Sequence, residues 1–157
     1  MHRVTHSDMK ISSPAFDDGK KIPARFSRDG DDRIPPLEIR EVPRDAKSLV
    51  LIIDDPDAPG GTFTHCVAYD IETTTNLIDA SLLPKLAIGT NSFGQALYGG
   101  PQPPDREHRY FFRLYALDAR LGLEGSPERD TVEAAMRPHV MEEASLMGRF
   151  APEDIPG

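Results

Sequence analysis

The sequence of 157 residues contains one cysteine, Cys66, and no tryptophan. A single thiol excludes an internal disulfide and any metal site built from several thiolates. Long apolar segments are also absent, because no uncharged apolar run approaches the roughly 18 residues that span a bilayer. The longest such run, residues 48–53, has the length of a strand. We therefore expect a soluble globular protein.

Positive charge is scarce, since the sequence has 18 Lys and Arg residues and 26 Asp and Glu residues, which gives a net charge of -8. Nucleic-acid-binding surfaces need clustered basic side chains, so that class of partner is excluded. Stable membrane binding is not expected either, because no basic amphipathic helix is present. Residues 1–10 are polar and lack the apolar stretch of a secretory signal. The expected location is cytoplasmic.

Proline and glycine are abundant, with 15 and 12 residues, and they predict a loop-rich fold with few long helices. A chain of this length can bury the core of one domain. Strands are predicted over residues 10–13, 48–54, 65–71 and 109–117. The second of these is aliphatic enough for a central strand buried on both faces. In the third, strand alternation places His65, Val67 and Tyr69 on one face and Cys66 on the other.

One helix is predicted near the C-terminus. Asp130 fits the N-cap and Glu133 the capping-box position. Apolar residues recur at helical spacing up to Gly148, the predicted stop, and Pro138 is expected to bend or split the helix. A short helical turn is expected over residues 82–87. Strands that precede a helix at hairpin-sized spacings predict a mainly β fold with antiparallel pairing.

Carboxylates directly follow the most apolar predicted strand, in the loop 54–61. Pro56 and Pro59 stiffen this loop, so Asp55 and Asp57 are expected to be held at the mouth of the core. The alternative is an ordinary polar turn at the end of a strand.

Histidines mark two further segments. A lone strand histidine such as His65 is more often structural than functional. Alternation points its neighbour Cys66 to the opposite face, which disfavours a Cys–His nucleophile and predicts a small core residue. His108 and Tyr110 share one face of the strand that follows residues 98–107, whose paired glycines can bring backbone N–H groups close to an anion. The alternative there is a proline-rich connection with a solvated charged run.

These motifs resemble those of the phosphatidylethanolamine-binding protein family, also called Raf kinase inhibitor protein-like, in its prokaryotic branch. The first match is Asp55-Pro56-Asp57-Ala58-Pro59 followed by His65. The second is the stretch Tyr98–Tyr110, which contains Gly100-Pro101 and His108-Arg109-Tyr110. The likeness runs from about Met9 to Phe150 and implies a single domain over residues 9–157, with residues 1–8 as an N-terminal extension.

The resemblance implies a mainly β fold with a large central antiparallel sheet, a smaller second sheet and a few peripheral helices, including one C-terminal helix. It also implies a homodimer, and a small pocket for phosphate, a phosphoryl headgroup, acetate or a similar carboxylate, without a cofactor or metal ion. The residues that match the family's pocket are Asp55, Asp57, His65, Gly100, Pro101, His108 and Tyr110.

In such a pocket the two imidazoles, the Gly100 N–H and the Tyr110 hydroxyl supply hydrogen-bond donors. A carboxylate repels an anion, so Asp55 and Asp57 are expected to orient the imidazoles and favour their protonated form. Anion binding is then expected to be tighter below about pH 7. Relatives typically carry Pro-Pro-Lys-Gly before the second histidine, whereas this chain has Asp105-Arg106 after its paired prolines.

The favoured function is a non-enzymatic protein that binds a small anion or phospholigand and modulates a kinase or hydrolase partner. One alternative is an enzyme, a hydrolase or a metal-dependent one, that uses the same Asp and His side chains. No Gly-x-Ser-x-Gly elbow, phosphate-binding Walker loop or His-Glu-x-x-His motif supports it. The other alternative is a protein-interaction inhibitor with a vestigial pocket.

Overall fold

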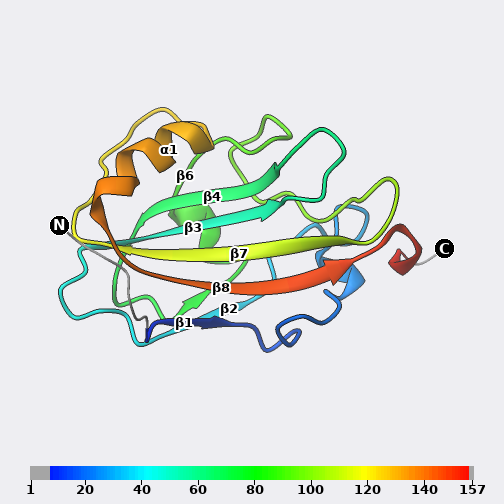
Figure 1. Ribbon diagram of the computed structural model, residues 1–157, viewed down its shortest axis with the longest axis horizontal. Helices are drawn as coiled ribbons and strands as arrows, with labels where there is room; N and C mark the ends of the chain where they lie inside the picture. The colour runs from blue at the N-terminus through cyan, green and yellow to red at the C-terminus, as the bar shows by residue number, and fades with distance from the viewer. Residues whose placement is uncertain (1–7, 156–157) are drawn as a thin grey trace.

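The computed structural model describes residues 8–155, so most of the predicted N-terminal extension lies outside the described residues. The described chain forms two antiparallel sheets (Figure 1), a larger one with strand order β6-β4-β3-β7-β8 and a smaller one with order β1-β2-β5. The mainly β fold predicted from the sequence is confirmed. The elements are β1 (Lys10–Ser12), β2 (Leu37–Arg40), β3 (Ser48–Asp55), β4 (Phe63–Ile71), β5 (Leu77–Ile78), β6 (Ala87–Ile88), β7 (His108–Leu117), α1 (Arg129–Met136) and β8 (Val140–Phe150). Short 3₁₀ turns cover Ala24–Phe26, Leu83–Lys85, Arg137–His139 and Pro152–Asp154.

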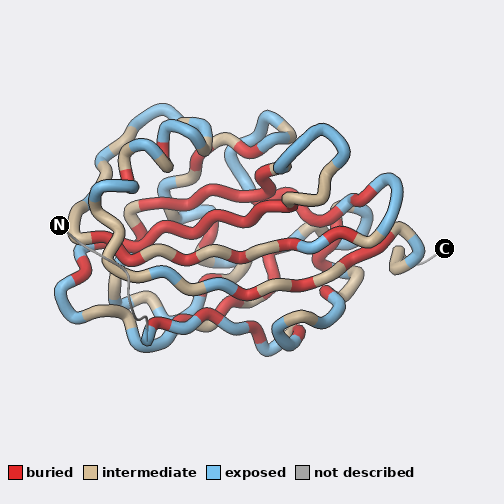
Figure 2. The backbone as a smooth tube through the Cα atoms, in the orientation of Figure 1, coloured by how far each residue is buried: buried red, intermediate tan, exposed pale blue. Residues whose placement is uncertain are grey.

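Both faces of the larger sheet are covered, and this explains why β3 is buried along its whole length (Figure 2). Leu49, Leu51 and Ile53 point into the larger core cluster, which continues into the smaller sheet. Val50 and Ile52 point to the other face, where α1 covers them. With an apolar layer on each side, β3 is aliphatic at every position from Leu49 to Ile53, and polar residues occur only at its two ends.

The predicted long C-terminal helix is wrong beyond Met136. The helix ends there, a 3₁₀ turn contains Pro138, and the rest of the segment is strand β8. Proline lacks the N–H that the next helical turn needs. β8 pairs with β7 along its length, from Val140 opposite Leu117 to Phe150 opposite His108. This ladder of backbone hydrogen bonds outweighs the local helical preference.

The start of the helix also differs from the prediction. The N-cap is Glu128, no side chain caps the helix, and Asp130 lies within the first turn. Glu133 forms no capping box but accepts a hydrogen bond from Arg129 Nε at 3.1 Å. None of the described helices is long and apolar enough to cross a membrane.

A β-bulge in β4 overturns the predicted side for His65. Ile53 pairs with Cys66 and Asp54 pairs with Thr64, so His65 is an extra residue in the ladder. The bulge turns His65 toward the larger core, whereas Val67 and Tyr69 face α1. Cys66 also packs in the larger core, so it is the buried core residue that was expected, although not because it faces away from His65.

Candidate functional site

Three chain segments meet at one end of the larger sheet and enclose a cavity of about 360 Å³. Antiparallel pairing places the end of β3 next to the starts of β4 and β7. Asp55, His65, His108 and Tyr110, which the sequence predicted, all line this cavity. The wall is completed by the loop 58–62 and by Phe63, Phe93, Gln102 and Pro104.

His108 is held between two carboxylates. Its ring is 1% exposed, with Nδ1 2.6 Å from Asp55 Oδ2 and Nε2 2.7 Å from Asp105 Oδ1. Each ring nitrogen of His108 therefore has a carboxylate oxygen as its partner. Asp55 thus orients His108, as the sequence predicted. Asp105 occupies the other nitrogen, which the sequence analysis left for the anion.

His65 is oriented by the backbone and not by a carboxylate. Its Nδ1 lies 2.7 Å from the carbonyl oxygen of Gly99 and donates its hydrogen there. Burial lowers the pKa of His65, although the charge of Asp55 opposes the shift. The expectation that carboxylates favour its protonated form therefore fails for this ring. A neutral His65 protonated on Nδ1 has an unprotonated Nε2, which can accept a hydrogen bond.

The Tyr110 hydroxyl is buried and makes no hydrogen bond of good geometry with residues 8–155, although the nearby Asp55 carboxylate is close enough to act on its pKa as an acceptor. Tyr110 is 1% exposed, lines the cavity, and its ring meets that of His65 edge to face at a centroid distance of 5.3 Å. Burial and the charge of Asp55 raise its pKa, so the hydroxyl keeps its proton. A buried polar group without a partner is rare in folded proteins. Tyr110 therefore offers a donor to whatever fills the cavity.

Asp57 holds the frame of the site and does not line the cavity. Its two carboxylate oxygens accept hydrogen bonds of 2.9 Å from Nε and Nη2 of Arg109, which lower the pKa of Asp57 to about 2. Its backbone N–H donates to Asp55 Oδ1 at 2.8 Å. Asp57 thus fixes the loop to β7 and steadies Asp55, and the expectation that it orients an imidazole is wrong.

Gly100 and Pro101 also act outside the cavity. The Gly100 N–H donates to Asp32 Oδ1 at 2.7 Å, so it is not left for an anion as predicted. The Pro101 carbonyl accepts from the backbone N–H of Arg28 at 3.0 Å. A Cβ at position 100 would collide with the backbone of residues 26–28. Only glycine permits this close approach, which anchors the loop that leads to His108.

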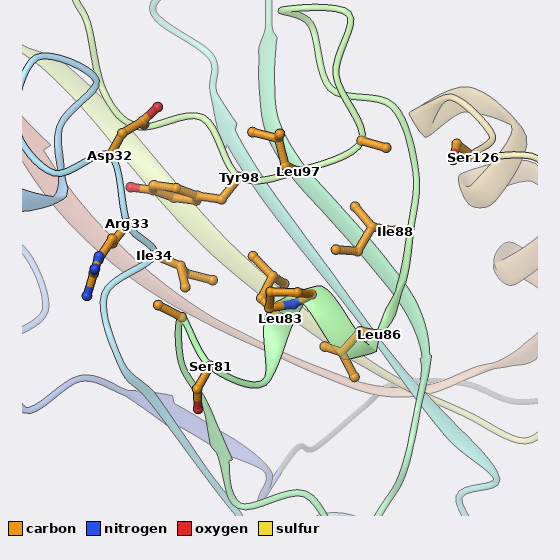
Figure 3. A pocket seen from close by; sticks show the side chains of 13 residues that line it. Asp32, Arg33, Ile34, Ser81, Leu83, Leu86, Ile88, Leu97, Tyr98 and Ser126 are labelled. Atoms are coloured by element: carbon orange, nitrogen blue, oxygen red, sulfur yellow. The ribbon is translucent and has the colours of Figure 1, made fainter.

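A larger hollow of about 820 Å³ lies elsewhere, between the loop that holds Ile34 and the chain around Leu83 and Leu97 (Figure 3). Its walls are mostly aliphatic, and the one aromatic hydroxyl, of Tyr98, already donates to the Phe26 carbonyl at 2.8 Å. No histidine lines it. Of these two cavities, the smaller one holds the histidines.

Asp105, Phe93 and Asp32 were not among the predicted site residues. Phe93 stacks edge to face on Phe63 at 4.7 Å and closes one wall. Phe93 lies in the segment Asn91-Ser92-Phe93-Gly94, outside the two motifs from which the site was predicted. Asp105 was visible as a departure in the loop before His108, but its contact with the ring depends on a loop conformation that no spacing rule gives.

Comparison with known proteins shows to which family the chain is similar. A sequence model of the family described as phosphatidylethanolamine-binding protein matches residues 12–151. A UPF0098 protein of Methanothermobacter thermautotrophicus is 45% identical over 148 residues, covering 90% of this chain and 98% of that protein. A UPF0098 protein of Archaeoglobus fulgidus is 41% identical over 146 residues, but the chain spans only 49% of its length.

Two solved structures are similar to this one. A phosphatidylethanolamine-binding protein homologue, CT736 from Chlamydia trachomatis, is 36% identical with a TM-score of 0.87, over 90% of this chain and 96% of that one. The protein YbcL from E. coli, described as a member of the mammalian PEBP family, is 23% identical with a TM-score of 0.84, over 92% and 98%. At that identity, the second similarity is one of fold.

Proposed function

We propose that this chain, which belongs to the phosphatidylethanolamine-binding protein family, binds a small oxyanion in the cavity between His65 and His108. The observation that carries the proposal is the buried Tyr110 hydroxyl, which lines that cavity without a hydrogen bond of good geometry in the described chain. Leaving a buried hydroxyl unpaired costs about 1–3 kcal/mol. An oxygen of a bound anion would accept its hydrogen and remove that cost.

The cavity suits a phosphoryl group better than a bare spherical anion. A volume of about 360 Å³ is within the usual range for small-molecule sites and leaves room for a headgroup beyond the phosphate. Neutral His65 has an unprotonated Nε2, which accepts a hydrogen from hydrogen phosphate but not from a fully ionised anion. Protonation of His65 converts that nitrogen into a donor, so the range of anions should widen in acid.

The proposal includes that the chain binds the anion without catalysing a reaction on it. The only thiol, of Cys66, is fully buried, and burial raises its pKa to about 12, so little thiolate forms at neutral pH. The Ser92 hydroxyl accepts a hydrogen bond from the Thr64 N–H at 2.8 Å and does not line the cavity. The kinase or hydrolase partner, the homodimer implied by the family resemblance and the cytoplasmic location expected from the sequence belong to the same proposal.

Isothermal titration tests the proposal with phosphate, phosphorylethanolamine and sulfate at pH 6 and pH 8. We expect phosphate and phosphorylethanolamine to bind at both values. Sulfate, whose charge is constant over this range, should bind mainly at pH 6, because it cannot donate to neutral His65. The window for this gain lies below about pH 6.5, the ordinary pKa of histidine, because burial lowers the pKa of His65.

The variants are Tyr110→Phe, which removes only the hydroxyl, and the double variant His65→Ala, His108→Ala. We expect about tenfold weaker phosphate binding in the first, the value of one hydrogen bond to a charged group, and no measurable binding in the second. Circular dichroism checks that both remain folded. If the natural chain binds none of the anions, or if the double variant binds phosphate as tightly as the natural chain, the proposal is wrong.

A further inference from the structure

Asp105 places a carboxylate at the one His108 nitrogen that an anion could use. Asp55 holds Nδ1 from inside the protein, with its side chain only 4% exposed. Asp105 holds Nε2 from the loop outside, with its side chain 45% exposed. A ligand anion that binds His108 must therefore take the position of the Asp105 carboxylate.

From this geometry we propose that Asp105 is a built-in competitor for the anion, which binds by displacing the Asp105 side chain from His108. The inference rests on the proposed function and adds the regulation of that site. The carboxylate of Asp105 is itself a small oxyanion tethered beside the cavity. As long as it contacts Nε2, both ring nitrogens of His108 are paired with carboxylates, and their negative charge repels a further anion.

The Asp105 side chain is free to leave, whereas Asp55 is not. Nearly half of the Asp105 side chain already meets solvent, and its neighbour Arg106, 62% exposed with Nε 3.8 Å from Asp105 Oδ2, can follow it. A carboxylate that turns into water leaves no unpaired buried charge behind. Moving Asp55 would strand an ionised group in the core and release the Asp57 N–H as well. Pro103 and Pro104 stiffen the preceding loop. The loop backbone can therefore stay in place, because rotation of the Asp105 side chain alone releases His108.

This competition selects for anions with several oxygens. Acetate that replaced Asp105 would exchange one carboxylate for another at His108 and gain little. A phosphoryl group offers further oxygens to Tyr110 and a hydrogen to His65, contacts that Asp105 does not make in this structure. The chain should therefore distinguish phosphoryl ligands from monocarboxylates, and the source of that distinction should be Asp105.

Titration of phosphate and acetate into Asp105→Ala, Asp105→Asn and the natural chain at pH 7 and constant ionic strength tests this inference. We expect phosphate to bind about tenfold more tightly to Asp105→Ala, which corresponds to about 1.4 kcal/mol, and acetate to become measurable. Asp105→Asn should fall between, since the amide can still bond to His108 but carries no charge. Glu107→Gln is the matched control, because it removes a negative charge from the same loop while its ion pairs are with Lys21 and Arg149. Its phosphate affinity should stay within about twofold of that of the natural chain.

The outcomes separate this inference from the proposed function. If the natural chain binds phosphate and Asp105→Ala binds it no more tightly, the competition is wrong while the anion site stands. If neither binds any anion, both fail. Should Asp105→Ala not fold, the carboxyl ¹³C resonance of Asp105 in the natural chain gives the answer. It should move on saturation with phosphate, and by more than that of Asp55, which keeps its contact with His108; an unmoved Asp105 resonance would overturn the inference.

Discussion

Three carboxylates near the end of β3 have three different roles because their positions in the backbone differ. Asp54 faces α1 and is 1% exposed, with Oδ2 2.7 Å from Nη1 of Arg129. Asp55, one residue later, faces the cavity and holds His108. Asp57 lies in the loop and fixes it to β7. Strand alternation places Asp54 and Asp55 on opposite faces of the sheet. The three aspartates therefore serve a helix contact, the binding site and the loop, respectively.

Protonation of His65 should weaken the fold in mild acid. Burial lowers the pKa of His65 in the folded protein, so folding favours the neutral ring. That contribution to stability is fully present above the unfolded pKa of about 6.5 and is lost as the pH falls below it through the folded pKa. The replacement His65→Gln does not titrate, and its amide can still donate to the Gly99 carbonyl.

Urea unfolding at pH 7.5, 6.5 and 5.5 measures the effect. The free energy of unfolding of the natural chain should exceed that of His65→Gln most at pH 7.5, and the difference should shrink at each step toward pH 5.5. A difference that stays constant across the three values would show that the ring does not titrate in this window.

At the scale of elements, the site depends on one irregularity in β4 and on the edge strand β8. The bulge turns His65 to the side of the cavity, where its ring contacts that of Phe63 at a centroid distance of 4.9 Å. A regular strand would have directed His65 toward α1. β8 extends the sheet beyond β7, and Gly148 of this strand pairs with Tyr110. The loop 16–22 packs over that position.

Gly148 should be the least replaceable residue of β8. A Cβ there would collide with the side chains of Ile22 and Phe16. Gly148→Val should therefore destabilise the protein by about 1–3 kcal/mol, the usual cost of overpacking a core. Ser145→Val is the control, because Ser145 is exposed on the same strand and a β-branched residue suits an exposed strand position.

Chemical unfolding of Gly148→Val and Ser145→Val measures the change in the free energy of unfolding for each variant. The Ser145 variant should differ from the natural chain by no more than about 0.5 kcal/mol. Equal losses in the two variants would mean that the close packing at Gly148 contributes nothing specific.

At the scale of the whole molecule, the cavity lies where segments distant in the sequence meet at one end of the larger sheet. The backbone N–H of Gly99 donates to the His65 carbonyl, while the His65 ring donates to the Gly99 carbonyl. Gly100 is in turn tied to Asp32 in a third segment. The site is therefore part of the tertiary framework, and a ligand that fills it should stabilise the entire fold.

Phosphate should raise the melting temperature of the natural chain. A ligand at 100 times its Kd adds about 2.7 kcal/mol to the stability of a protein that binds it only when folded. For a chain of this size the shift is about 5–11 °C. Differential scanning calorimetry with phosphate, matched in ionic strength by chloride, measures it. Tyr110→Phe should show a clearly smaller shift, and identical shifts in the two proteins would indicate a general salt effect.

The sequence by itself determined the class of fold and the two histidines, the carboxylate and the tyrosine at the centre of the cavity. The aliphatic run of β3 predicts a strand buried on both faces, and the motifs around His65 and His108 identify the family. These features are local, because they depend on which side chains a segment carries. Four of the seven predicted site residues line the cavity for this reason: Asp55, His65, His108 and Tyr110.

Only the tertiary structure decided what the remaining groups do. The segment that became β8 has helical spacing, but pairing with β7 made it a strand. The Gly100 N–H was predicted to bind an anion, but the approach of Asp32 engaged it. The face of the sheet on which the His65 side chain lies depends on a bulge in β4. The contact of Asp105 with His108 depends on the conformation of the loop before β7. Each of these outcomes depends on a partner distant in the sequence or on an irregular backbone, which local periodicity does not encode.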